Sequence, residues 1–486
     1  MVDPNNPKKT LIVGALWSVG ARWAIKGIGF INTVIMARLL MPADYGVVAM
    51  AMLVVALIQA LLDFGAGIAL LRKVEVSKDE IDSAWTLRLL QSVAVAVILI
   101  AIAPLASRYF NEPRVINVLL ILAVCVALSG AGNIGMVLAL KEFKFSLEFR
   151  YNVISKVLSV IATVVAGYFL RDYRALVVGI AFGYIAGLVL SYVMHPYRAR
   201  WNTSKIGEIW AVTKWLMFSG VGTFLLRNTD ELVAARIGST NEYGVYNVGS
   251  DLGRLPVGEL GPAMMRAFLP VLTSIQSDMQ RTNEAVIKTL SAVNAITLPV
   301  GFGVAALSVP LVEFILGVRW IEATPFVAMF ALLGSIQFAT SPLNSLLIMR
   351  GYTRSQNMGV WVEFLVFLIA ALIVVPKLHI VGLVWARLFA AFVNFFFVCF
   401  VSVRYCGLSF GSIFFALFRS LVAAALMGGV VFYVAGFLDA AWLKLFVGVL
   451  FGVVVYSLLL LICWISFGRP DGLESTLTEY LISAKG

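Results

Sequence analysis

The amino-acid sequence predicts an all-α polytopic membrane protein with about fourteen transmembrane helices, arranged as two parallel six-helix lobes plus two C-terminal helices. Three observations lead to this fold class. The 486 residues are 61% hydrophobic and 13% charged, with a mean hydropathy of +0.95. Soluble domains hold roughly 45–50% apolar and about 25% charged residues, so an excess of this size belongs in lipid. Long apolar runs and an internal repeat are the other two observations.

The apolar runs define the predicted spans, because a helix needs roughly 20 mostly apolar residues to cross the hydrocarbon core. The eighth run carries charges and prolines and is the least regular. The predicted spans are residues 11–38, 46–67, 84–105, 115–139, 149–169, 175–194, 210–236, 243–270, 289–315, 324–349, 358–376, 380–403, 413–437 and 442–466.

The distribution of Lys and Arg orients the predicted bundle. With the N-terminus in the cytoplasm, the cytoplasmic loops and ends hold 20 Lys and Arg residues, against 8 on the opposite side. The positive-inside rule therefore predicts that both termini lie in the cytoplasm. Most of the net charge of +11 reflects this topology, so it gives no reason to expect a nucleic-acid partner. It also favours contact with anionic membrane lipids.

The sequence predicts neither a cofactor nor a metal site. The first apolar run is too long for the core of a secretory signal peptide and carries Arg22 and Lys26, so no cleaved leader is expected. The four cysteines and two histidines have no metal-binding or redox spacing. A GxxxxGK[ST] loop is absent, so transport energy must come from an ion gradient, the membrane potential or the substrate's own gradient.

An internal repeat relates the two halves of the chain. Ala37–Arg38 after the first predicted helix are followed, at a spacing of eight residues, by Tyr45–Val47. Ala235–Arg236 and Tyr243–Val245 repeat this pattern after the seventh helix, with a shift of 198 residues in both cases (235 − 37 and 243 − 45). Six predicted helices separate the copies, so both halves enter the membrane in the same sense, as in transporters built from parallel repeats. A chance match of a short turn motif is the alternative.

The repeat predicts the domain organisation. We expect an N-terminal lobe at residues 1–194, a cytoplasmic connector at 195–209 and a C-terminal lobe at 210–405. Residues 406–486 then hold the last two helices and a cytoplasmic tail.

Charged residues inside the spans are the candidate functional residues, because each costs at least about 2.5–3.5 kcal/mol on insertion scales unless it faces a partner or water. In the first helix Arg22 and Lys26 are four residues apart, hence on one face, with no acid in that helix. They suggest a water-filled lumen that attracts an anion. Snorkelling toward the cytoplasmic headgroups is the alternative.

The seventh and eighth helices carry both signs of charge. Arg227 can reach Asp230 or Glu231 along one helix face, so a structural ion pair and a coupling site for protons or cations are both open. The eighth helix holds Asp251, a further candidate for coupling or for an ion pair, and several Gly and Pro residues. It marks either a pathway or hinge, or packing kinks without a transport role.

Several segments resemble bacterial oligosaccharide flippases that move O-antigen or exopolysaccharide repeat units, in the polysaccharide transporter family. The opening stretch is ARLLMPADYGVVAMA at Ala37–Ala51, followed by DFGAGIALLRK at Asp63–Lys73. Further matches are the segments KEFKF (Lys141–Phe145), RNTD (Arg227–Asp230), YGVY (Tyr243–Tyr246), RLP (Arg254–Pro256) and FLP (Phe268–Pro270). The resemblance covers most of residues 10–405 and does not identify the glycan.

This resemblance implies membership of the multidrug/oligosaccharidyl-lipid/polysaccharide flippase superfamily, with two lobes around a central cavity. The expected function is to turn a polyprenyl-pyrophosphate-linked glycan from the cytoplasmic to the periplasmic leaflet of the bacterial inner membrane by alternating access. Related flippases place cations on the first and eighth helices, which here implies substrate binding by Arg22, Lys26, Arg254 and Arg266. The acids of the seventh and eighth helices depart from that cationic pattern.

Other classes remain as alternatives. A cation or drug exporter of the same superfamily would share the fold. A major-facilitator transporter usually has a Gly-x-x-x-Asp-Arg-x-Gly-Arg-like loop after its second helix, where this chain has Leu71–Val76. A membrane glycosyltransferase or polymerase usually has a large external loop, which is not predicted here, so we expect no enzyme. A polysaccharide polymerase and glycosyltransferases are expected as partners by analogy, although no motif identifies them.

Overall fold

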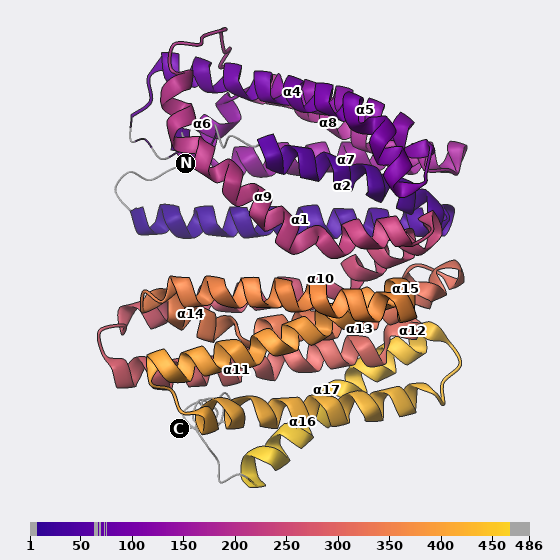
Figure 1. Ribbon diagram of the computed structural model, residues 1–486, viewed down its shortest axis with the longest axis vertical. Coiled ribbons are helices and arrows are strands. Elements are labelled where there is room, and N and C mark those ends of the chain that lie inside the picture. The colour runs from indigo at the N-terminus through magenta and orange to yellow at the C-terminus, as the bar shows by residue number, and fades with distance from the viewer. Residues whose placement is uncertain (1–6, 63–66, 68–69, 72, 74, 467–486) are drawn as a thin grey trace. The chain divides into compact units, whose positions relative to one another are not determined.

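The computed structural model describes residues 7–62, 67, 70–71, 73 and 75–466 (Figure 1). In this part of the chain the elements are helices, and no strand occurs. The chain divides into two compact units, residues 1–244 and 245–486, and the boundary falls inside α10. Much of the segment Asp63–Lys73 lies outside the described residues.

The first unit contains the helices up to the start of α10. They are α1 (Pro7–Leu39), α2 (Pro42–Leu62), α4 (Lys78–Phe110), α5 (Arg114–Gly130), α6 (Gly135–Lys141), α7 (Phe145–Leu170), α8 (Arg174–Met194), α9 (Ile206–Ile237) and α10 (Thr240–Ser274). Within this unit α7 packs along α8 and α1, and α4 packs along α5. Helix α2 contacts α4, α5 and α9.

The second unit continues from within α10 to α17. Its further elements are α11 (Met279–Ala306), α12 (Ser308–Ile315), η1 (Val318–Ala323), α13 (Thr324–Ala339), α14 (Ser341–Met349), α15 (Thr353–Cys406), α16 (Phe410–Ala435) and α17 (Ala441–Ser466). Helix α11 packs against α13 and α16, and α16 packs against α17. Figure 1 shows the long helices of each unit running beside one another as a bundle.

The helices confirm an all-α polytopic membrane fold. Among the described residues, nine helical segments are long and apolar enough to cross a membrane, or ten if the bent pair α5 and α6 is one span. The predicted first, seventh and eighth spans lie on α1, α9 and α10. The total of about fourteen, and the division into lobes at residues 194, 210 and 405, stay predictions.

Two predicted spans are broken rather than straight, and a third break falls between two predicted spans. Helices α5 and α6 meet at 58°, and the ninth predicted span is divided at Leu307, between α11 and α12. In α15 the break falls at His379, whose φ of 48° and ψ of −136° are not helical. It separates the predicted spans 358–376 and 380–403. The preceding Pro376 lacks the N–H that would continue the helix.

The two copies of the repeat begin their helices in the same way. At the start of α2, the Asp44 carboxylate accepts a hydrogen bond from the Met41 amide at 3.0 Å. At the start of α10, the Glu242 carboxylate accepts one from the Ser239 amide at 2.7 Å. Both acids satisfy an amide at a helix N-terminus, where negative charge is also favoured by the helix dipole. The acid before each repeated Tyr is therefore a helix cap.

The same two helix starts contact each other through their glycines. A Cβ at Gly46 would lie 2.0 Å from the Thr240 carbonyl oxygen, and a Cβ at Gly244 would lie 1.9 Å from the Pro42 carbonyl oxygen. The partners are again 198 residues apart (240 − 42 and 244 − 46). Only glycine permits this backbone approach, so the repeat places equivalent positions against one another.

The predicted connector is held on the N-terminal end of α4. The Asp82 carboxylate, nearly fully buried, accepts hydrogen bonds from the Tyr197 hydroxyl at 2.9 Å and the Arg200 amide at 3.0 Å. Thr86 Oγ1 accepts one from the Asn202 amide at 3.0 Å. Burial, followed by the bond to Asp82, raises the pKa of the Tyr197 hydroxyl. The connector therefore packs as an ordered part of the first unit.

Candidate functional site

The cations of α1 lie on one exposed face of the helix. Arg22 and Lys26 are both exposed, while Ala21 is buried. Trp17 of the same helix, itself 40% exposed, contacts Phe149 of α7 edge to face, with ring centroids 5.0 Å apart. Because a charge facing lipid is costly, this exposed face of a membrane helix is better suited to water than to acyl chains.

Lys156 of α7 extends this face. A Cβ at Gly29 would lie 3.6 Å from Cε and 3.9 Å from Nζ of Lys156. Gly29 is seven residues after Arg22 and three after Lys26, so all three positions share one face of α1. We call Arg22, Lys26 and Lys156 the cation stripe. The sequence marks Lys156 as a charge inside a span, but gives no sign that it neighbours α1.

The predicted charges of α9 differ in burial. Asp230 is fully buried, Glu231 is half-buried and Arg227 is exposed. Each of the three takes part in a polar or electrostatic contact. A buried carboxylate needs such compensation, which the contact of Asp230 supplies.

On α10 the predicted cations have different surroundings. The Arg254 guanidinium lies 4.3 Å from the ring centroid of Phe330 on α13, which is a cation–π contact. Arg266 is exposed, and so is Asp251, three residues before Arg254. Arg254 therefore has a packing role within the second unit, whereas Arg266 is accessible. Their role in binding substrate stays a prediction.

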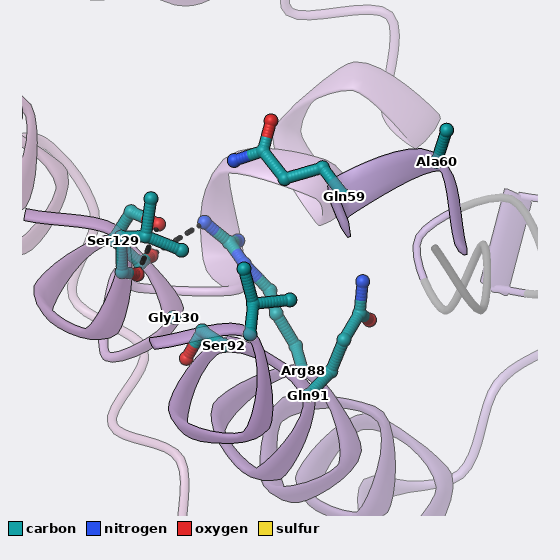
Figure 2. Close-up of a pocket in the computed structure, with 9 residues that line it drawn as sticks. Gln59, Ala60, Arg88, Gln91, Ser92, Ser129 and Gly130 are labelled. Atoms are coloured by element: carbon teal, nitrogen blue, oxygen red, sulfur yellow. Dashed lines mark hydrogen bonds between the residues drawn. The ribbon is translucent and has the colours of Figure 1, made fainter. Parts of the chain in front are cut away.

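A polar cavity of about 260 Å³ lies between α2, α4 and α5 in the first unit. Gln59, Arg88 and Gln91 extend into it, with Ser92 and Ser129 at its wall (Figure 2). The Arg88 guanidinium donates a hydrogen bond to the Ser129 carbonyl oxygen at 2.9 Å. None of the described residues that line this cavity is acidic. The sequence marks Arg88 as a charge inside a predicted span, but gives no sign of the cavity around it.

A second cavity, of about 420 Å³, lies between α11, α12, α16 and α17. Its lining is almost entirely apolar and includes Val300, Leu311 and Val449. Two hydroxyls border it, but both are already used: Tyr456 donates to the Ala295 carbonyl and Ser457 to the Val453 carbonyl, each at 2.8 Å. The cavity thus suits a hydrocarbon chain rather than a sugar.

Metal-ligating side chains are not clustered in the part of the chain that the structure describes. No group of three or more His, Cys, Asp or Glu residues there could hold a metal ion. Three of the four cysteines are buried as free thiols, and Cys463 is half-buried. They pack as small apolar side chains.

Comparison with known sequences identifies relatives over most of the chain. A family model described as polysaccharide biosynthesis protein matches residues 35–325. The lipopolysaccharide biosynthesis protein WzxC of Escherichia coli K12 is 23% identical over 70% of this chain and 70% of its own. The succinoglycan biosynthesis transport protein ExoT of Rhizobium meliloti is 24% identical over 68% of this chain and 67% of its own.

Two solved structures share the fold. The lipid II flippase MurJ, in an inward closed conformation, superposes with a TM-score of 0.72 at 15% identity, covering 93% of this chain and 99% of its own. An inward-facing multidrug resistance MATE family transporter of the MOP superfamily gives a TM-score of 0.58 at 16% identity, covering 78% and 94%. At these identities the likeness concerns the fold.

Proposed function

The chain belongs to the polysaccharide biosynthesis protein family, so it is a membrane transport protein and not an enzyme, and we propose that it flips polyprenyl-pyrophosphate-linked oligosaccharide repeat units. The direction is from the cytoplasmic to the periplasmic leaflet of the inner membrane, by alternating access. The translocated units serve the biosynthesis of cell-surface polysaccharide, such as lipopolysaccharide or exopolysaccharide.

The observation that carries this proposal is the cation stripe of Arg22, Lys26 and Lys156. A pyrophosphate cannot enter hydrocarbon unaided, because burying unpaired charges is prohibitive. Guanidinium offers phosphate oxygens a planar fork, and ammonium offers a compact charge. A stripe with both groups can hold the headgroup while the sugars remain in water. Arg254 and Arg266 are proposed as further contacts.

The apolar cavity of the second unit supports the same assignment. A polyprenyl chain has no hydrogen-bonding group, and this cavity offers almost none in return. We propose that it receives part of the polyprenyl tail. The substrate then has two kinds of binding surface, polar for its headgroup and apolar for its tail.

The proposed reaction also has expected neighbours and an expected orientation. A glycosyltransferase must complete the repeat unit before translocation, and a polymerase must use it afterwards, so both are proposed partners. Both chain termini are proposed to lie in the cytoplasm, which follows from the distribution of Lys and Arg.

A cation or drug exporter of the same superfamily is the second candidate. It is favoured by Asp230, because a buried carboxylate can take up and release a proton during transport. Drug-efflux assays in cells that lack other exporters separate the two. Efflux that is lost in Asp230→Asn, without glycan translocation, would establish the exporter.

The flippase proposal is tested with purified protein in liposomes that carry a fluorescent polyprenyl-pyrophosphate oligosaccharide. Translocation is followed as exposure to an external glycosidase, with and without a proton or sodium gradient. We expect protein-dependent exposure that falls about tenfold or more in Arg22→Ala, since hydrogen bonds to charged groups contribute about 1.5–3 kcal/mol. Arg174→Ala is the control, because this exposed cation starts α8 outside the stripe.

Two outcomes count against the proposal. Absence of exposure with two different lipid-linked glycans and under either gradient removes the flippase assignment. Equal rates for wild type, Arg22→Ala and Lys26→Ala leave a flippase but remove the stripe as its headgroup site.

A further inference from the structure

The polar cavity around Arg88 is separate from the residues assigned so far. Its lining comes from α2, α4 and α5, so neither α1 nor the cation stripe contributes to it. It also lies within one unit, with all its lining residues between Gln59 and Gly130. A charged cavity inside a membrane bundle needs an explanation, since an ionised side chain there is costly.

Part of the cost is offset by a structural contact of Arg88. Its hydrogen bond goes to Ser129, one residue before the end of α5. A cation at a helix C-terminus is favoured by the helix dipole. This bond uses one of the five N–H donors of a guanidinium. It explains why the Arg88 side chain points toward the end of α5, but it does not use all of the donors.

The other polar groups of the cavity divide into used and available ones. The Ser92 hydroxyl donates to the Leu89 carbonyl at 2.8 Å, and the Ser129 hydroxyl donates to the Val126 carbonyl at 2.7 Å. The Gln59 side chain already shares a hydrogen bond with Tyr184 of α8, and the carboxamides of Gln59 and Gln91 both line the cavity that holds the guanidinium (Figure 2). A carboxamide both donates and accepts, which suits hydroxyl groups.

The size of the cavity limits its occupant. Small-molecule sites usually measure roughly 300–1,000 Å³, and this cavity of about 260 Å³ falls just below that range. It can receive one sugar residue or one phosphate group, but not an oligosaccharide. The guanidinium favours an oxyanion. The two carboxamides can form hydrogen bonds with hydroxyl groups or other oxygen atoms next to that oxyanion.

From this geometry we infer that the cavity around Arg88 binds one oxyanion-bearing group of the translocated glycolipid. The group is either the carboxylate of an acidic sugar residue or a phosphate of the pyrophosphate. Arg88 pairs with the oxyanion, and Gln59 and Gln91 bind the adjacent oxygens. This inference deepens the proposed function and rests on it for the source of the ligand, although binding itself does not require translocation.

The test measures binding without transport. Purified protein in detergent is heated in the presence of sodium glucuronate, inorganic pyrophosphate or glucose, with sodium chloride matched for ionic strength. A ligand at about ten times its Kd should raise the unfolding midpoint by about 1–3 °C. We expect this rise with glucuronate or pyrophosphate and none with glucose. It should disappear in Arg88→Gln and need at least about threefold more ligand in Gln91→Ala.

Each outcome supports or overturns anion binding in the cavity around Arg88. A rise with glucuronate identifies the acidic sugar as the source, and a rise with pyrophosphate identifies the headgroup. The inference is overturned if neither anion acts, if glucose acts equally, or if the rise persists in Arg88→Gln. Should that variant not fold, an unchanged response of Gln91→Ala overturns it instead. Binding that persists in a protein unable to translocate glycolipid would reject the proposed function and leave the anion site standing.

Discussion

The ammonium group of Lys156 belongs to the cation stripe only because α7 packs beside α1 at Gly29. If the stripe holds a pyrophosphate, Lys156→Met should slow translocation about tenfold, because one charged contact of about 1.5–3 kcal/mol is lost. Lys156→Arg should keep most of the rate, since it retains the charge. The liposome assay measures both variants. Equal activity of Lys156→Met and wild type would confine the stripe to α1.

Glu112 connects the start of α5 with the start of α10, and its contribution to the stability of the fold depends on pH. Its carboxylate accepts hydrogen bonds from Arg114 at 2.8 Å and from Thr240 at 2.7 Å. The bond to Arg114 is the main reason that the pKa of Glu112 is lowered to about 2. A lowered folded-state pKa means that the stabilisation is complete above the ordinary Glu pKa of about 4.3 and is lost as pH falls toward 2.

Thermal unfolding between about pH 5 and pH 2.5 checks this expectation. The unfolding midpoint of the wild type should fall more steeply across that range than the midpoint of Glu112→Gln, whose side chain does not titrate. Parallel slopes for the two proteins would show that Glu112 does not hold this contact in solution.

The residue scale is where the sequence is least informative. It identifies Arg22 and Lys26 because their spacing along one helix is sufficient evidence of a shared face. It cannot identify Lys156 or Arg88 as members of a site, because their neighbours come from other helices. Arg254 shows the opposite case, since its contact with Phe330 gives a structural reason for a charge that the sequence suggests as a ligand.

At the scale of elements, the close contact between the starts of α2 and α10 leads to a prediction about two glycines. A methyl group at Gly46 or Gly244 would meet a carbonyl oxygen at 2.0 or 1.9 Å, so the backbone of one helix must shift. Overpacking of this kind costs about 1–3 kcal/mol. We expect Gly46→Ala and Gly244→Ala each to lower the thermal unfolding midpoint and to reduce translocation.

Gly222→Ala provides the matched control. Gly222 lies on α9, and a Cβ there would have nothing within 4 Å. The substitution should stabilise the helix by up to about 1 kcal/mol, because Ala is the better helix former. If Gly46→Ala and Gly244→Ala behave like Gly222→Ala, the close contact is absent from the functional protein.

Hydropathy predicts where the elements lie better than it predicts their continuity. Where the structure describes them, the predicted spans lie on one helix or on two successive helices, because the length of apolar sequence is fixed by the thickness of the bilayer. Hydropathy averaged over a whole span hides the bend between α5 and α6 and the division at Leu307, although Gly130, Gly132 and Asn133 lie at the bend and Pro310 follows the division. Pro376 does signal the break at His379.

For the molecule as a whole, the internal repeat conveys more than any single span. It predicts that Gly46 and Gly244 are equivalent, and the structure brings these two positions together. The apolar cavity of the second unit had no such signal, because its residues look like ordinary membrane-spanning sequence. The position of a cavity therefore depends on how the helices pack, whereas the class of protein follows from composition and from the repeated motif.

The orientation of the whole chain in the membrane is the remaining prediction. Arg174 at the start of α8 belongs to the predicted periplasmic side, and Arg281 in the first turn of α11 belongs to the predicted cytoplasmic side; both are exposed. A membrane-impermeant maleimide applied to intact spheroplasts should label Arg174→Cys and spare Arg281→Cys. Inside-out vesicles should give the reverse pattern. Native labelling should be low, because three of the four cysteines are buried. The opposite result would invert the bundle, and with it the leaflet from which the glycolipid is taken.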